Sequence, residues 1–511
     1  MTSFPYLSVL TLAPLVGAAI VAFLPRRRPA LAKQVALIWS LAVLALTTVM
    51  WVAFEAGGSR FQFRESYPWI PVWGVNVTFA ADGIALVMLA LIAVLLPVVI
   101  IASWHDAEGG RRSVPAYFAL LLVLESTMIG VFAAADVFLF YVFFEIMLVP
   151  MYFLIGSFGG HQRQYAAVKF FLYSLVGGLF MLAAVIGLWV LAGRALGEPT
   201  FDWQALTQID LSTGAERWLF LGFFIAFAVK APFFPFHTWL PDAGSAAPAG
   251  AAALLVGVLD KVGTFGILRY CLPLFPEASR YFAPLALTLA VVGIIYAALL
   301  AVGQNDLKRL VAYTSIAHFG FIGVGIFAFT TQAGTGAVLY MLNHGLATGL
   351  LFLVVGMFVA RRGSALISDF GGAGTMVPVL AGVFLFAGLA SLALPGLAPF
   401  VSEFMVLIGT LTVNKTVAVI ATAGIVLAAA YVLWMIQRTT QGTLNPALST
   451  VDGMRRDLTW RETAVVAPLI VLLIVLGFYP KPVIDVINPA VTATLQQDMG
   501  VQDPAPTEAS R

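Results

Sequence analysis

The chain has 511 residues, of which 61% are hydrophobic and 10% are charged, and its formal net charge is +2. Soluble domains carry roughly 25% charged residues, so this composition excludes a soluble globular protein, and its excess of apolar residues excludes a disordered chain. The single cysteine, Cys271, leaves no disulfide framework and no cysteine cluster for zinc or iron–sulfur. The near-neutral charge gives no indication of a nucleic-acid partner. We therefore expect an all-α polytopic membrane protein.

Apolar segments long enough to span a bilayer recur about 14 times along the chain, whereas the short alternating runs typical of transmembrane strands are missing from the sequence. The first segment has no basic region before it and is interpreted as a retained span rather than a signal peptide. In chain order the segments cover residues 5–25, 32–54, 79–103, 115–134, 136–157, 165–193, 217–240, 248–271, 282–303, 309–328, 334–360, 376–412, 416–437 and 463–480.

Two of these segments contain prolines that should interrupt a helix. Segment 217–240 carries Pro232 and Pro235, and segment 376–412 carries Pro395 and Pro399. Proline removes a backbone donor and clashes with the preceding turn, and at membrane depth such a break persists only where protein or water satisfies the freed backbone groups. Because the two breaks are five segments apart, we expect a repeated unit of five helices, whose odd number inverts the second copy, as in many transporters.

The predicted organisation follows from these repeats. Lys and Arg collect in alternate loops, notably 26–33, 111–112, 308–309, 361–362 and 455–461, and this bias places both termini on the outer side of the membrane. We expect helices 1–3 with an outer loop at 55–78 in residues 1–114, the first repeat (helices 4–8) in 115–272, the inverted repeat (helices 9–13) in 281–440, helix 14 in 463–483, and a polar C-terminal tail in 484–511.

Ionisable residues inside the apolar segments are the main functional candidates, because each costs several kcal/mol in a bilayer unless it is paired or hydrated. Four of them stand out, and they are Glu145, Lys230, Lys261 and Glu403. Lys230 adjoins the first break and Glu403 the second, so we expect them to be counterparts in the two repeats, a cation in one and an anion in the other. A Glu145–Lys230 pair whose separation changes would take up and release a proton.

A second group of polar residues could extend this path. His318 and His344 can both give and accept a proton near neutral pH, although a packed structural histidine is the alternative for each. Glu125 lies in the middle of a segment, and His237 should lie at the inner mouth of the first break. Asp260 either pairs elsewhere or reaches its neighbour Lys261 through water, while Lys308 is either an interface anchor or a relay.

Five stretches of this sequence resemble the antiporter-like membrane subunits of proton-pumping NADH–quinone oxidoreductase, respiratory complex I. They read FFEIMLVPMYFLIG, FAVKAPFFPFHTWLPDA, LKRLVAYTSIAHFGF, LNHGLATGLLFLVVG and LAPFVSEFMVLIGTL. The resemblance implies 14 helices, two inverted repeats and a central proton path through Glu145, Lys230, Lys261 and Glu403. It also implies that this chain holds no cofactor, since FMN, iron–sulfur clusters and a quinone would belong to other subunits.

The resemblance further implies which subunits this chain binds and in which membrane it lies. Its expected partners are other complex I subunits, especially the antiporter-like chains L and N, together with the bilayer and protons in a bacterial plasma membrane. Those two chains typically carry Lys where this sequence has Glu403, and chain L has a long lateral helix where this sequence has a short polar tail. The sequence departs from the family pattern in the loop LPDAGSAAPAG and at Asp260. The alternative is a subunit of a multisubunit Na⁺/H⁺ antiporter, with Glu403 beside unwound carbonyl groups as a sodium ligand.

Overall fold

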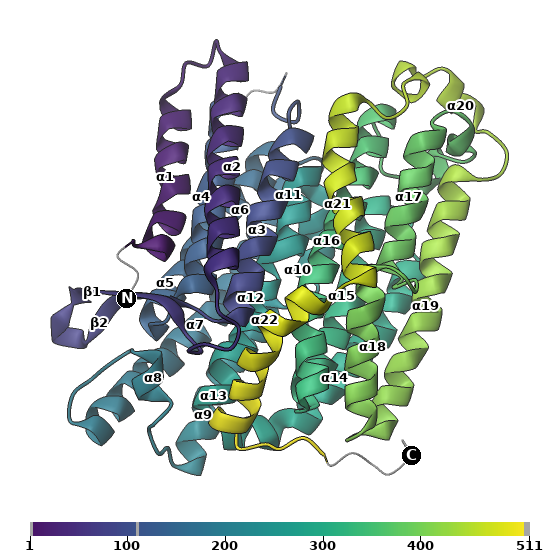
Figure 1. The fold of residues 1–511 in the computed structure, drawn as a ribbon. Helices are drawn as coiled ribbons and strands as arrows, with labels where there is room; N and C mark the ends of the chain where they lie inside the picture. Colours follow the sequence, from purple (N-terminus) through teal and green to yellow (C-terminus); the bar gives the residue numbers. More distant parts are fainter. Residues whose placement is uncertain (1–3, 109–111, 505–511) are drawn as a thin grey trace.

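Long helices lie side by side with their axes close to one common direction in the structure, a computed structural model that describes residues 4–108 and 112–504 (Figure 1). Among the described residues, 12 helices are long and apolar enough to cross a membrane. Two broken helices, α9–α10 and α17–α18, run among them, so the architecture agrees with the predicted polytopic bundle, while the count of 14 crossings stays a prediction.

The N-terminal part contains three helices and a strand hairpin that the sequence did not predict. The helices are α1 (Tyr6–Phe23), α2 (Pro29–Ala53) and α3 (Gly83–Ala102), and strands β1 (Gln62–Ile70) and β2 (Val75–Ala81) pair antiparallel between α2 and α3. The hairpin occupies most of the predicted outer loop at 55–78, and its second strand continues to Ala81. Its turn ends at Gly74, whose φ of 68° is in the left-handed region that favours glycine.

The first repeat begins with helix α4 and ends with a helix that changes its winding. The 4-residue helix α8 (Trp203–Leu206) lies in a loop of this region. The other helices are α4 (Val114–Ala133), α5 (Val137–Ile146), α6 (Leu148–Phe158), α7 (Arg163–Leu196), α9 (Thr213–Lys230), α10 (Trp239–Ala246), α11 (Ala249–Leu254), α12 (Lys261–Gly266) and α13 (Leu272–Leu274). Two π-helical stretches, Leu255–Leu259 and Ile267–Cys271, join the last three of these into one continuous rod.

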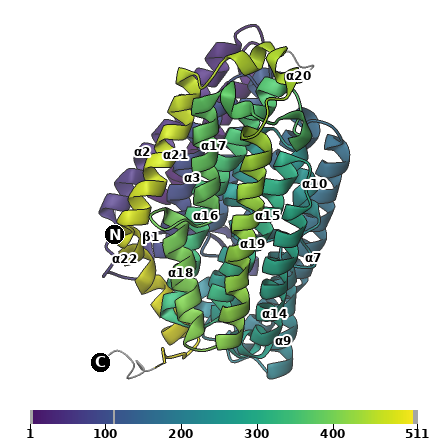
Figure 2. The same ribbon diagram turned by 90° about the vertical axis from the view of Figure 1, so that its right-hand side faces the viewer.

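The second repeat has the same order of elements, with its break again in the fourth helix. Its helices are α14 (Pro276–Val302), α15 (Leu307–Phe327), α16 (Thr331–Arg362), α17 (Pro378–Ser391), α18 (Ala398–Leu411) and α19 (Lys415–Thr440). The two views at right angles show α15 and α16 inside the bundle and α19 at its edge (Figures 1 and 2). Both predicted breaks are thus confirmed, at residues 231–238 and 392–397.

The C-terminal region corrects the predicted polar tail. After the short helix α20 (Pro446–Ser449) and the span α21 (Trp460–Phe478), helix α22 (Lys481–Thr492) and a π-helical stretch, Ala493–Asp498, continue along the bundle (Figure 1). The sequence reading missed this helix because it is amphipathic rather than uniformly apolar, with Val483, Val486, Ile487, Ala490 and Val491 on one buried face. Residues 505–511 of the predicted tail, and Arg111 of a predicted inner loop, lie outside the described residues.

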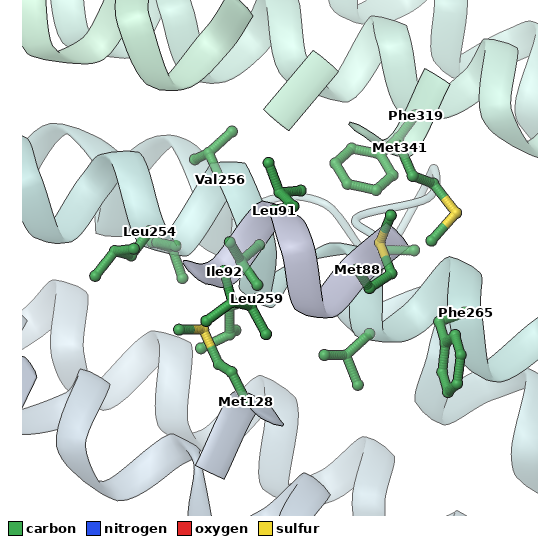
Figure 3. Close-up of a cluster of buried hydrophobic side chains, with 14 of the residues drawn as sticks. Met88, Leu91, Ile92, Met128, Leu254, Val256, Leu259, Phe265, Phe319 and Met341 are labelled. Atoms are coloured by element: carbon green, nitrogen blue, oxygen red, sulfur yellow. The ribbon is translucent and has the colours of Figure 1, made fainter. Parts of the chain in front are cut away.

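The centre of the bundle is apolar and closely packed around α11 and α12. Figure 3 shows Met88, Leu91 and Ile92 of α3 together with side chains from α4, α12, α15 and α16 around this rod. By contrast, the peripheral helices expose large apolar side chains, such as Phe180 on α7 at 50% and Val426 on α19 at 70%. Lipid is the environment that tolerates such a surface, so the peripheral helices form the lipid-facing wall and the central rod is sealed from it.

Candidate functional site

The first break ends α9 at Lys230 and leaves residues 231–238 outside a regular helix before α10 begins. Pro232 and Pro235 prevent the helix from continuing, because neither has a backbone N–H to donate. The indole Nε1 of Trp239 donates to the carbonyl oxygen of Val229 at 2.9 Å and so satisfies one of the groups at the broken end. Lys230 is therefore fixed by the break at the end of a helix, deep inside the protein.

The ammonium group of Lys230 lies among aromatic rings. Its Nζ is 5.2 Å from the ring centre of Phe144 and 5.5 Å from that of Phe170, within the range of cation–π attraction. The side chain is fully buried, and among the described residues Nζ has no hydrogen-bond partner and no carboxylate within 4.0 Å. Such a group is held by weak contacts alone, so its charge can be changed without breaking a strong bond.

Glu145 lies at the end of α5, two residues before Met147, which separates α5 from α6 in an interruption of the helix that the sequence did not predict. Its Oε1 is buried without a hydrogen-bond partner among the described residues. The carboxylate is seated against Gly178 of α7, where any Cβ atom would overlap Oε1. Glu145 and Lys230 are close enough for their charges to interact but are not in contact, so the predicted switching pair stays a prediction.

Lys261 begins a continuous line of polar contacts. Its Nζ donates to the backbone carbonyl of Val256 and lies 2.8 Å from Nδ1 of His344 on α16. Since a lysine ammonium has no lone pair, Nδ1 is the acceptor and the imidazole carries its proton on Nε2 in this arrangement. When Lys261 is an ammonium, His344 is thus positioned to accept a hydrogen bond, and then a proton, from it.

The line continues from His344 to Glu403. The rings of His344 and His318 have centres 5.4 Å apart, Nδ1 of His318 is 2.7 Å from the hydroxyl of Tyr340, and that hydroxyl donates to Oε2 of Glu403 at 3.0 Å. Because the phenol has one proton and gives it to Glu403, Nδ1 of His318 is the donor to the phenol oxygen. The structure therefore joins Lys261, His344, His318 and Glu403 into one chain, with Tyr340 as a link that sequence reasoning missed.

Tyr340 could have been found from its spacing. It precedes His344 by four residues on α16, so both side chains lie on the same face of that helix. The helix is buried along almost its whole length, and a buried tyrosine hydroxyl normally requires a polar partner. A search for polar groups at helical spacing from each candidate would have placed Tyr340 in the path.

The second break separates α17 from α18, and Asn343 of α16 binds the first turn of α18. The amide Nδ2 of Asn343 donates to the carbonyl oxygen of Ala398 at 2.8 Å and to Oγ of Ser402 at 3.3 Å. Glu403 follows this break and lies inside α18, whereas Lys230 precedes the first break as the last residue of α9. The two residues thus lie on different sides of their breaks, and their correspondence in the two repeats stays a prediction.

The remaining candidates fall outside this chain. Glu125 is buried and His237 packs between the rings of Phe234 and Tyr296, with neither side chain hydrogen-bonded to a described residue. Lys308 donates to the carbonyl oxygens of Ser245 at 2.8 Å and Ala247 at 2.6 Å, so it caps the end of α10 as an anchor would.

Asp260 is fully buried, and both of its carboxylate oxygens have no partner in the described part of the chain. In the same part of the chain, no group of three His, Cys, Asp or Glu side chains is placed to hold a metal ion. The candidate residues of the interior therefore fall into one connected chain and a few isolated groups.

Known proteins are similar to this chain in sequence and in fold. The family model described as NADH:quinone oxidoreductase/Mrp antiporter, TM, matches residues 134–428. NADH-quinone oxidoreductase subunit M of Mycobacterium tuberculosis is 48% identical, over 100% of this chain and 97% of its own length. A chain in the solved structure of respiratory complex I from Thermus thermophilus with bound NADH has a TM-score of 0.87 at 31% identity and covers 97% of this chain and 100% of its own length.

A chain of the Mrp complex from a Dietzia species also has this fold. Its TM-score is 0.84, and the match covers 97% of this chain and 100% of that chain. The identity is 20%, a level at which the likeness concerns the fold alone.

Proposed function

This chain belongs to the family of NADH:quinone oxidoreductase/Mrp antiporter transmembrane subunits, and from that premise we propose that it is the M chain of a proton-translocating NADH–quinone oxidoreductase. It moves protons across the membrane and performs no redox step itself. FMN, iron–sulfur clusters and quinone are carried by other subunits, whose electron transfer supplies the energy. The antiporter-like chains L and N are its neighbours in a bacterial plasma membrane, with both termini on the outer side.

The observation that supports this function best is the buried chain of titratable groups from Lys261 to Glu403. Each member can both receive and give a proton, and successive members are linked by hydrogen bonds or, between the two histidines, by neighbouring rings. Side chains held in this order inside an apolar bundle have no structural advantage over apolar residues, because ionisable groups are costly to bury. A proton path explains why four helices contribute to one line.

The proposed path works by successive transfers between neighbours. Lys261 as an ammonium gives a proton to Nδ1 of His344, and the imidazole then carries the charge next to His318. The His344 imidazolium then passes a proton to Nε2 of His318. His318 in turn gives its Nδ1 proton to the Tyr340 oxygen as the phenol gives its own proton to Glu403, so Tyr340 and both histidines end with the number of protons they began with. Movement of Glu145 relative to Lys230 is the step through which the energy of electron transfer enters.

The first test asks what this chain assembles with. A tagged chain, extracted gently from the membrane, should co-purify on a native gel as a large particle that contains flavin and iron and stains for NADH oxidation. A small particle that contains no flavin and does not stain would overturn the proposal. That result would favour the alternative of a multisubunit Na⁺/H⁺ antiporter, for which Na⁺-dependent proton flux in vesicles is the assay.

The second test addresses the role of this chain within the assembly. Replacing Glu145 with Ala should leave assembly intact but suppress proton pumping and coupled quinone reduction in membrane vesicles. Normal pumping by an assembled Glu145→Ala enzyme would show that the switching pair has no such role.

A further inference from the structure

The rod formed by α11 and α12 stands between the two polar parts of the interior. On one side α9 ends at Lys230, and on the other side α16 presents His344 to Lys261. Apolar side chains, including Leu259 and Phe265 of the rod itself, fill the space around it (Figure 3). A proton that leaves Lys230 must therefore pass this rod to enter the chain that leads to Glu403.

The face of the rod toward α9 carries a carboxylate. Gly263 packs so closely on α9 that a Cβ atom there would lie 2.5 Å from the backbone nitrogen of Ala231, the residue after Lys230. Asp260 is three residues before Gly263, so its side chain is on the same side of the rod, one turn away. The charge of Asp260 accordingly interacts with that of Lys230 as well as with that of Lys261.

A different face of the rod, toward α16, carries Lys261. Gly257 and Gly345 allow the rod to touch α16 directly, since a Cβ atom on Gly345 would lie 2.6 Å from the carbonyl oxygen of Gly257. Lys261 reaches His344 on this side. Consecutive residues thus direct opposite charges to different faces of one helix, since neighbouring helix positions are rotated by about 100°.

Asp260 differs from an ordinary structural ion-pair partner. It is fully buried, and within the described part of the chain neither carboxylate oxygen accepts a hydrogen bond or lies within 4.0 Å of a lysine nitrogen. A structural carboxylate at this depth would be expected to have its hydrogen bonds satisfied. An unsatisfied carboxylate placed between two buried lysines matches instead a group that accepts a proton from one of them and gives it to the other.

We propose that Asp260 is the relay residue that carries protons across the α11–α12 rod between Lys230 and Lys261, an inference that rests on the proton path proposed above. In the first transfer the Lys230 ammonium loses a proton to the Asp260 carboxylate, which leaves a neutral amine and a carboxylic acid. In the second the acid gives that proton to the neutral amine of Lys261, which restores the carboxylate and forms the ammonium that faces His344. One proton crosses the rod, and no other reactant is consumed.

The decisive experiment compares three variants of the assembled complex in proteoliposomes. Asp260→Asn keeps the size of the side chain and removes its proton-carrying group, and we expect proton transfer through this chain to slow about a hundredfold, within the range that general acid–base groups contribute. Asp260→Glu should restore most of the transfer. Thr264→Val is the matched control, since Thr264 is equally buried one turn further along the rod and donates only to the carbonyl of Lys261.

The results of these variants distinguish a failure of the Asp260 relay from a failure of the proposed function. If Glu403→Gln lowers the number of protons moved per NADH but Asp260→Asn does not, the relay is wrong and the function stands. If neither variant lowers it, the function itself is wrong. If the Asp260→Asn variant does not assemble, the Asp260→Glu variant is the deciding test. A carboxylic acid that carries the proton gives a C=O band in the infrared difference spectrum measured during turnover. Lengthening its side chain must shift that band. An unshifted spectrum would overturn the proposal.

Discussion

The two helix breaks lie at the same place in their repeats but surround their charged residues in opposite ways. At the first break the ammonium group of Lys230 lies near two aromatic rings and has no hydrogen-bond partner among the described residues. At the second, Glu403 accepts a hydrogen bond from Tyr340, which continues to His318 and beyond. The isolated group is suited to respond to an outside signal, and the connected group is suited to pass a proton onward.

This difference shows that a repeated fold need not have a repeated function. A charge that only weak contacts hold can be moved or neutralised by a small change nearby, because little binding energy is lost. A charge in a hydrogen-bonded chain is harder to move, since each hydrogen bond fixes the geometry of the next. We therefore expect energy to enter this chain at the first break and protons to pass through it at the second.

The largest expected effect comes from removing the isolated charge. Lys230→Met should slow proton transfer through this chain at least a hundredfold, because the group that receives the signal is lost, and the range for acid–base groups reaches about ten-thousandfold. The variant should assemble and be as heat-stable as the parent or more so, since the cost of burying an ammonium disappears. Proton uptake by proteoliposomes measures the transfer rate, and thermal unfolding of the assembled complex measures the stability. Normal pumping with a marked loss of stability would show that Lys230 has a structural role and not a signalling one.

Breaking the hydrogen-bonded chain at Tyr340 should slow proton transfer less than the loss of Lys230 does. Tyr340→Phe removes the hydroxyl that links His318 to Glu403, and we expect transfer to slow roughly tenfold to a hundredfold, less than loss of a titrating group because water can replace a hydroxyl. The two orphaned partners should also lower stability by about 1–3 kcal/mol. Pumping and thermal unfolding of the same sample test both effects, and unchanged values would mean that the chain of contacts is not a path.

A third substitution tests the seat of Glu145 without changing any charge. Gly178→Ala places a methyl group where the Glu145 carboxylate lies, so the carboxylate must move relative to Lys230. We expect coupled quinone reduction to fall severalfold while the uncoupled activity is retained. Gly382→Ala on α17 is the control, because no atom lies within 4 Å of the added methyl group there. Equal behaviour of the two variants would show that the position of Glu145 does not matter.

The smallest effect is expected far from both breaks. Arg60 holds the C-terminal segment by donating to Asp498 at 2.7 Å and to Thr494 at 2.9 Å. Arg60→Met should leave pumping nearly unchanged and make residues after α22 more accessible to proteases, at a cost of about 1 kcal/mol for a partly exposed pair. A large loss of pumping in this variant would place the C-terminal segment in the transfer mechanism.

Much of this organisation could be predicted from the sequence because bilayer physics leaves strong signals. Long apolar runs predicted the helices, and Pro232, Pro235 and Pro395 predicted both breaks. The scarcity of charge inside spans made Lys261 and Glu403 visible at once, and the structure places both in one chain with His318 and His344.

Other features could not be predicted because their signals are local or depend on tertiary contacts. Helix α22 is amphipathic, so a search for uniform hydropathy overlooks it. The π-helical stretches beside Asp260 have no composition that distinguishes them from an ordinary buried helix. The contact between His318 and Tyr340 joins α15 to α16, and only the packing of those two helices brings the rings together. Which polar residues meet is thus decided by packing, although which residues are polar is read from the sequence.

The π-helical stretch Leu255–Leu259 determines which way the next residues face. Such a stretch adds one residue to a turn, so every side chain after it is rotated by about 100° about the helix axis compared with an unbroken α-helix. Shortening the rod by one residue before Asp260 would turn the carboxylate and the ammonium away from α9 and α16 together, with no change in composition. The phase of a single helix, together with the identity of the residue at position 260, thereby decides whether a proton can pass between the two halves of the molecule.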